Sequence, residues 1–239
     1  MLGRFLEFSI ATPDILASMD FYSRLGFSEA EVGETWTYPY AVVTDGRVCL
    51  GLHQSPGKVS SITFVKPDLL KYLGHLEALG IKFDFRHLGN DVFNEVTWSD
   101  PSGHSIHLIE ARTFSPSKRA TTATSLCGYF EEIALPTTDT IEASAYWEKL
   151  GFVAMDEPDA WLSHVSCTCD SVDIGLYEPG RILRPSLLFE ADDLDGQMAR
   201  LSEVGVHPAS EISRRDQTPA KVLYAPEGTP ILMTASQNQ

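Results

Sequence analysis

The sequence predicts an α+β fold made of four βαβββ units, and two observations carry this prediction. The first is a helical segment that begins with Asp and ends with Leu-Gly or Val-Gly, with a spacing of twelve residues from Asp to Gly. It occurs four times, at 14–26, 68–80, 139–151 and 193–205. The second is the distance between copies: they begin 54, 71 and 54 residues apart, so the units form two pairs. Self-similarity at fixed intervals is typical of duplicated structural units.

The first unit opens with a strand at residues 5–11, where apolar and polar or small residues alternate. Leu6, Phe8 and Ile10 share one face of this strand, and Glu7 lies on the other. The apolar face is therefore expected to pack on a core, and the Glu7 face to point away from it.

A helix is predicted from Asp14, whose side chain can cap free N–H groups, to Gly26, which suits a left-handed C-terminal cap. Residues three apart share a helix face. The expected buried stripe consists of Leu16, Met19, Tyr22 and Leu25.

Three short strands are expected after this helix, near 27–30, 36–44 and 47–54. Asp45-Gly46 is a strong hairpin signal between the last two, because both residues accept the positive φ of a tight turn. The second unit repeats the plan. Its strands are expected at 61–65, 82–86, 93–98 and 105–109, and its helix at 68–79. Residues 100–103, Asp-Pro-Ser-Gly, form its closing turn.

The two pairs of units predict two domains. The first domain spans 1–112, with units at 1–54 and 59–112, and the second spans 129–239, with units at 129–178 and 184–236. Residues 113–128 show no periodicity and are expected to form a linker. Each unit places one helix on one face of a curved mixed sheet. The other face then needs a partner sheet or a ligand, and two units side by side are expected to form a cup.

The second pair matches the first at an offset of 125 residues, which places Glu7 on Glu132 and Ser61 on Ser186. One residue is expected to be lost after the turn at 170–171, so that Gly51 matches Gly175. The matched positions of the two cups can therefore be compared one by one.

Bulk composition narrows the function classes. The chain of 239 residues is 43% hydrophobic and 21% charged, as is typical of a globular protein. Its net charge of −15 argues against binding to nucleic acid, which needs clustered Lys and Arg. We expect no membrane segment and no signal peptide. Four scattered cysteines favour a reducing, cytoplasmic setting, and a monomer or homodimer is expected.

Two sequence motifs resemble those of the vicinal oxygen chelate superfamily, which includes glyoxalase I, bleomycin-resistance proteins and extradiol dioxygenases. They are FYSRLGF (21–27) with DPSG (100–103), and AYWEKLGF (145–152) with APEG (225–228). The resemblance covers nearly the whole chain as two tandem glyoxalase-like domains. It implies the fold and leaves the reaction open.

Enzymes of this superfamily hold a divalent metal in the cup through His, Glu or Gln. The matching positions here are Glu7, Gly51, Ser61 and His107 in the first domain, and Glu132, Gly175, Ser186 and Leu232 in the second. Gly and Leu offer no ligand atom, and a neutral Ser hydroxyl is a poor one. The resemblance thus implies an incomplete metal site.

Two reduced metal sets remain open under the resemblance. One is Glu7, His53 and His107 within the first domain; the other is Glu132 with His107, which requires units to be exchanged between domains. A usable site normally has three protein ligands. No cofactor is favoured, and the alternative is one divalent ion of Mn, Fe, Ni or Zn.

Glu7 and Glu132 are also candidate general bases, because burial in a cup raises the pKa of a carboxyl group and suits proton transfer. The alternative is a structural carboxylate inherited through the duplication. His53 and its counterpart Tyr177 face the cups and can orient a polar or aromatic ligand, together with Ser61 and Ser186.

Several aromatic residues lie on candidate cup-wall strands, and Trp36 and Trp161 are the candidates for stacking on a ligand. The others are Tyr38, Tyr40 and Trp98. Cys167 and Cys169, with His164 just before them, superficially suggest zinc, but no second Cys pair completes a tetrahedral site.

The favoured function is therefore binding of a small, hydrophobic or aromatic molecule in a cup, as in bleomycin-resistance proteins. The first alternative is a metal-dependent lyase, isomerase or dioxygenase with a reduced ligand set. The second alternative is a degenerate scaffold or interaction module.

Overall fold

The computed structural model describes residues 2–31, 37–55, 59–90, 92–111, 125–158, 160–213 and 219–236. Within them lie four helices and two mixed eight-stranded sheets, which confirms the predicted α+β fold of four βαβββ units. Most of the predicted linker 113–128, namely 113–124, lies outside the described residues. No described helix is long and apolar enough to cross a membrane.

The first sheet belongs to the first two units. Its elements are β1 (Arg4–Ala11), α1 (Ile15–Arg24), β2 (Ser28–Ala30), β3 (Tyr40–Thr44), β4 (Cys49–His53), β5 (Ser61–Lys66), α2 (Leu69–Ala78), β6 (Phe85–His87), β7 (Glu95–Ser99) and β8 (Ser105–Glu110). The strand order is β2-β3-β4-β1-β5-β8-β7-β6. The first strands of the two units, β1 and β5, pair antiparallel at the centre and join the units into one sheet.

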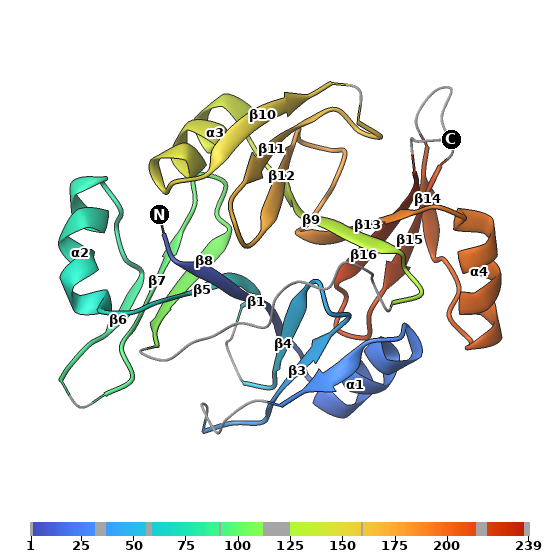
Figure 1. Ribbon diagram of the computed structural model, residues 1–239, viewed down its shortest axis with the longest axis horizontal. Helices are drawn as coiled ribbons and strands as arrows, with labels where there is room; N and C mark the ends of the chain where they lie inside the picture. The colour runs from blue at the N-terminus through green and yellow to red at the C-terminus, as the bar shows by residue number, and fades with distance from the viewer. Residues whose placement is uncertain are drawn as a thin grey trace.

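The second sheet repeats this arrangement in the order β10-β11-β12-β9-β13-β16-β15-β14. Its elements are β9 (Tyr129–Pro136), α3 (Thr140–Lys149), β10 (Val153–Glu157), β11 (His164–Thr168), β12 (Asp173–Tyr177), β13 (Ser186–Ala191), α4 (Leu194–Glu203), β14 (Ser210–Ile212), β15 (Ala220–Tyr224) and β16 (Pro230–Ala235). Each sheet is thus built from consecutive units. In Figure 1, α1 and α3 lie below and above the centre, and α2 and α4 lie at the two ends.

One hydrophobic core joins both sheets. It contains alternate residues of the central strands, such as Phe8 and Ile10 from β1 and Ile133 and Leu135 from β9, all of them buried. Each strand therefore turns one face toward this shared core. We call the opposite face of each sheet its distal face.

The halves also contact each other in a reciprocal way. The Leu2 N–H donates to the Leu150 carbonyl at 2.9 Å, and the Leu126 N–H donates to the Leu25 carbonyl at 2.7 Å. Leu25 and Leu150 end equivalent helices, α1 and α3. The duplicated domains therefore pack with approximate two-fold symmetry.

The helix starts follow the predicted capping with one exception. Asp14 and Asp139 each accept two backbone N–H groups, and Asp193 accepts one. Asp68 instead adopts a left-handed backbone with φ 55° and caps nothing. At α2 the Leu69 N–H donates to the Glu110 carboxylate at 3.0 Å, so a side chain from the end of β8 takes over the cap.

The predicted stripe of α1 is wrong at Leu16, which is 74% exposed. The buried face runs through Ser18, Tyr22 and Leu25, which are fully buried. Ser18, Tyr22 and Leu25 are four and three residues apart, so they share one face of the helix. Leu16 is two residues before Ser18 and points away from that face.

A β-bulge corrects the predicted alternation of the first strand. The pairing of β1 with β5 shifts between Phe5 and Glu7, so that Phe5 joins the core and Leu6 does not. The pairing of β9 with β13 shifts at the equivalent place, next to Glu131. An extra residue in one strand changes which side chains share a face, and simple alternation does not reveal it.

The position of the single deletion in the second half also differs from the prediction. Tyr40, the first residue of β3, pairs with His53, the last residue of β4. In the second sheet, His164 is the first residue of β11 and Tyr177 is the last residue of β12, so they occupy the equivalent positions. The turns at 45–48 and 169–172 have equal length. The deletion therefore lies before His164, and not after residues 170–171.

Candidate functional site

The distal face of the first sheet is polar. Its side chains alternate with core residues along β1, β4, β5, β7 and β8. We define the first distal face by Glu7, Ser9, His53, Ser61, Thr63, Glu95, Thr97 and His107. The strand register places these side chains in adjacent rows: Glu7 is opposite Thr63, and Thr63 is opposite His107.

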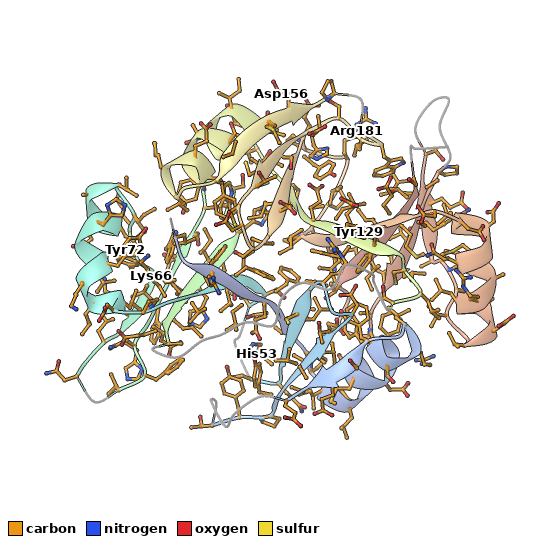
Figure 2. The ribbon with its side chains drawn as sticks, in the orientation of Figure 1. His53, Lys66, Tyr72, Tyr129, Asp156 and Arg181 are labelled. Carbon is orange, nitrogen blue, oxygen red and sulfur yellow. The ribbon has the colours of Figure 1, made fainter. Side chains whose placement is uncertain are left out.

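Glu7 is the centre of a hydrogen-bond network on this face. Ser9 Oγ donates to Glu7 Oε1 at 2.6 Å, and His53 Nε2 lies 2.8 Å from the same oxygen. Tyr40 donates its hydroxyl proton to Glu7 Oε2 at 2.6 Å. Tyr38 extends the network, since its hydroxyl lies 3.1 Å from His53 Nδ1. Figure 2 shows His53 beside β4.

This network fixes the charge of Glu7. Burial alone would raise the pKa of Glu7, but the hydrogen bonds from His53, Ser9 and Tyr40 and the charge of His53 together lower it. The expectation of a raised pKa is therefore wrong for Glu7. A carboxylate that accepts three donors is stabilised as an anion, which makes it a good hydrogen-bond anchor and a weak base.

The tyrosines beside Glu7 stay protonated. Burial and the charges of Glu95 and Glu7 raise the pKa of Tyr38 to about 12. Burial and the adjacent Glu7 carboxylate raise the pKa of Tyr40 further. Both phenols are therefore neutral near pH 7 and can act as hydrogen-bonding groups.

His107 is held by a different carboxylate on the same face. Its Nε2 lies 2.7 Å from Glu95 Oε2, and His87 Nδ1 lies 3.8 Å from the other oxygen of Glu95. The first distal face thus has two His–carboxylate pairs, Glu7–His53 on β1 and β4, and Glu95–His107 on β7 and β8.

The distal face of the second sheet keeps a similar triad in altered form. Tyr177 donates to Glu132 Oε1, and His164 Nε2 lies 3.4 Å from Glu132 Oε2. The His164 ring stacks on Tyr177 with centroids 4.6 Å apart. In the first sheet Tyr is on β3 and His on β4, whereas here His is on β11 and Tyr on β12. The Tyr and the His have therefore exchanged positions between the two sheets, while the Glu occupies the same position in both.

Gly51 and Gly175 make room for these carboxylates. A Cβ at Gly51 would lie 2.1 Å from the Glu7 carboxylate, and one at Gly175 would lie 2.1 Å from Glu132 Oε1. No side chain fits at either position while the Glu keeps its place. The absence of a ligand atom at these two sites therefore has a direct steric cause.

Apart from this shared triad, the two faces differ in polarity. The first face has Ser9, Thr63, Glu95, Thr97 and His107, where the second has Ala134, Leu188, Ala220, Val222 and Leu232. Trp161, Leu162 and Ile182 pack on the apolar set, and all members of this cluster are buried. The duplicate has therefore become a second, small hydrophobic core.

The predicted site residues divide between these faces. Ser61 Oγ lies 3.4 Å from Thr63 Oγ1 on the first face, while Ser186 donates to the Arg184 carbonyl at 2.8 Å. Trp161 packs in the apolar cluster of the second face. Trp36 lies outside the described residues. Trp98 is not on a cup wall: it is buried in the shared core, and its Nε1 donates to Tyr146.

Sequence reasoning missed four contributing residues. Ser9, Thr63 and Glu95 are on the expected face but carry no motif; the fourth is His164. His164 was assigned to a coincidental Cys-x-Cys pattern. Placing the deletion before His164 aligns Tyr40 with His164 and His53 with Tyr177. That alignment would have revealed that Tyr and His exchange positions between the two halves.

The donor set does not fit a divalent metal of the kind that the superfamily implies. Among the described residues, no group of three or more His, Cys, Asp or Glu side chains could hold a metal ion. Glu7 and His53 bond to each other, while His107 bonds to Glu95. The alternative pair is not brought together either, because Glu132 belongs to the second sheet and His107 to the first.

Comparisons with known proteins agree on the fold. No family model and no curated protein matches the chain. Among solved structures it is similar to catechol 2,3-dioxygenase, with 15% identity, a TM-score of 0.62, and coverage of 98% of this chain and 88% of that one. It is also similar to homoprotocatechuate 2,3-dioxygenase from Arthrobacter globiformis, with 16% identity, a TM-score of 0.63, and coverage of 98% of this chain and 80% of that one.

A third similar structure is the 2,3-dioxygenase LapB from Pseudomonas sp. KL28, with 17% identity, a TM-score of 0.58, and coverage of 99% of this chain and 94% of that one. These dioxygenases have the vicinal oxygen chelate fold. The resemblance predicted from the motifs is therefore confirmed at the level of the fold.

Proposed function

We propose that this protein binds a small molecule with an aromatic body and a polar group on the first distal face, and that it does so without a bound metal. The polar anchor is Glu7 with its donors, and the aromatic contacts are Tyr38 and Tyr40. The second distal face serves as a structural core.

The difference between the duplicated faces carries this proposal. At five matched positions the second face has Ala, Leu, Ala, Val and Leu, so the fold itself accepts an apolar lining. Burying polar groups costs free energy unless each finds a partner. The first face nevertheless buries Glu7, His53, Thr63 and His107, each of them at most 2% exposed. Packing does not require such a set, and this supports a role in ligand recognition.

The geometry of the rings supports an aromatic ligand. The Tyr40 ring lies 4.7 Å from His53 and Tyr38 lies 5.8 Å from it, measured between centroids. Rings at such distances pack favourably on one another and on a bound aromatic group. Two of the structural neighbours are named after catechol and homoprotocatechuate, which are hydroxylated aromatic compounds of this class.

Catechol is therefore the first compound to titrate, by isothermal calorimetry against the purified protein. Glu7→Gln removes the charge with little change of shape and should weaken binding about tenfold, which corresponds to roughly 1.4 kcal/mol. The matched control is Glu132→Gln on the second face, which should change affinity less than about twofold, within the range of a distant substitution.

Equal effects of the two substitutions would contradict the assignment to the first face. If wild-type protein binds no aromatic compound and contains no metal, the proposal fails in favour of a scaffold. Circular dichroism of both variants verifies that each is folded.

A further inference from the structure

The direction of each hydrogen bond on the first distal face follows from simple chemistry. The Glu7 carboxylate can only accept, so Ser9 donates its single hydroxyl proton to Glu7. Ser9 Oγ and Thr63 Oγ1 lie 2.6 Å apart, so Thr63 must donate to Ser9. The Thr63 proton is then committed, and Ser61 is the donor across the 3.4 Å contact with Thr63.

The same reasoning orders the aromatic side of the network. Tyr40 donates to Glu7, and His53 Nε2 donates to Glu7 as well. The Tyr38 hydroxyl lies 3.1 Å from His53 Nδ1, and the direction of this contact depends on the protonation of His53. The hydroxyl protons of Ser9, Thr63, Ser61 and Tyr40 therefore all point toward Glu7. Any further hydrogen bond that these hydroxyl oxygens make must be one that they accept.

Charge favours the same kind of ligand. Tyr38 responds to the negative charges of both Glu7 and Glu95, so the two carboxylates act on one region of the face. The Glu7 side chain is 3% exposed and enclosed by its donors, whereas that of Glu95 is 16% exposed. Glu95 is thus the more accessible of the two carboxylates, and it also pairs with His107 at 2.7 Å.

We propose that the first distal face selects a ligand that donates hydrogen bonds, specifically a protonated amine on an aromatic body, and that Glu95 is its counter-ion. This inference rests on the proposed function and names its ligand class. An ammonium group supplies several donors and a positive charge. A carboxylate or phosphate would meet hydroxyl oxygens that can only accept, beside the negative charges of Glu7 and Glu95.

Three compounds with the same ring and different polar groups test this: benzylamine, benzyl alcohol and benzoate. Saturation-transfer NMR and calorimetry at pH 7 give their affinities for wild-type protein. Benzylamine should bind tightest, benzyl alcohol more weakly and benzoate least, with about tenfold between the first and the last because hydrogen bonds to charged groups are the stronger ones.

Glu95→Gln should reduce benzylamine affinity about fivefold to tenfold and change that of benzyl alcohol less than twofold, since it removes a charge and keeps an acceptor. The control is Glu203→Gln on the exposed surface of α4, which should leave all three affinities unchanged. Added salt should weaken benzylamine binding more than benzyl alcohol binding.

The outcomes separate this inference from the proposed function. If benzoate binds as well as benzylamine, the ligand class is wrong while small-molecule binding stands. The same holds if benzylamine affinity is unaffected by Glu95→Gln. If none of the three compounds and no catechol binds, the proposed function itself is wrong.

Discussion

At the scale of single residues, His164 shows how geometry sets a protonation state. Its Nδ1 lies 2.8 Å from the Leu162 carbonyl, which can only accept, and its Nε2 faces the Glu132 carboxylate. Two acceptors favour the form of the ring in which both nitrogens carry protons. Burial by itself lowers the pKa of His164, but the hydrogen bond and the charge of Glu132 outweigh it and raise the pKa.

This arrangement predicts how stability depends on pH. A histidine whose folded pKa is raised stabilises the protein fully below its unfolded pKa, about 6.5, and the contribution is lost as pH rises through the folded value. Urea unfolding from pH 5.5 to 9 should show the wild-type free energy of unfolding falling more than that of His164→Gln. Exposed His207→Gln is the control and should follow the wild type.

Glu131 titrates in the same range, because burial and the adjacent charge of Glu190 raise its pKa to about 7. All three proteins share this group, so the difference between them isolates His164. Parallel pH curves for the wild type and His164→Gln would show that His164 is neutral in the folded state.

The repeat in the sequence related Glu7 to Glu132, and the structure places both at matched positions of their sheets. Prediction from the sequence failed for the partners of those residues. The pKa of Glu7 depends on three donors from β1, β3 and β4, and their convergence is a property of the folded sheet. His164 was missed because a short motif was weighed in place of its strand partner Tyr177.

At the scale of elements, Gly51 shows that a strand can be fitted to a side chain of its neighbour. Gly51→Ala would place a Cβ on the Glu7 carboxylate and should lower the free energy of unfolding by about 1–3 kcal/mol, the usual cost of overpacking. Chemical denaturation measures this change.

The double variant Gly51→Ala, Glu7→Ala should recover part of this loss, because residues in contact are energetically coupled. The control, Gly74→Ala, lies inside α2 with nothing within 4 Å of the added Cβ. It should stabilise the protein by about 0.5–1 kcal/mol through helix propensity. Equal effects of Gly51→Ala and Gly74→Ala would contradict the close approach of Glu7.

The helices and most strands were predictable because their signals are local: a capping Asp, a terminal Gly and regular alternation. Departures arise from long-range contacts. Glu110 replaces Asp68 as the cap of α2, and a bulge removes Leu6 from the core. Neither has a signature within its own segment, because each depends on the register of paired strands.

At the scale of the whole molecule, the repeat predicted four units and left their pairing open. The structure pairs β1 with β5 and β9 with β13, so consecutive units share a sheet. Sequence could not decide this, because all four first strands are equivalent copies and each offers a similar edge. The polarity of the two distal faces follows from this pairing, since it determines which strands contribute to each face.

The central claim is that the polar distal face binds a small aromatic molecule without a metal. Elemental analysis and calorimetry on one preparation, purified without chelator, test it most directly. The account predicts metal content well below one equivalent and one binding site per chain for catechol or benzylamine. Near-stoichiometric Mn, Fe, Ni or Zn that disappears in His107→Ala, with ligand binding lost alongside it, would contradict the account.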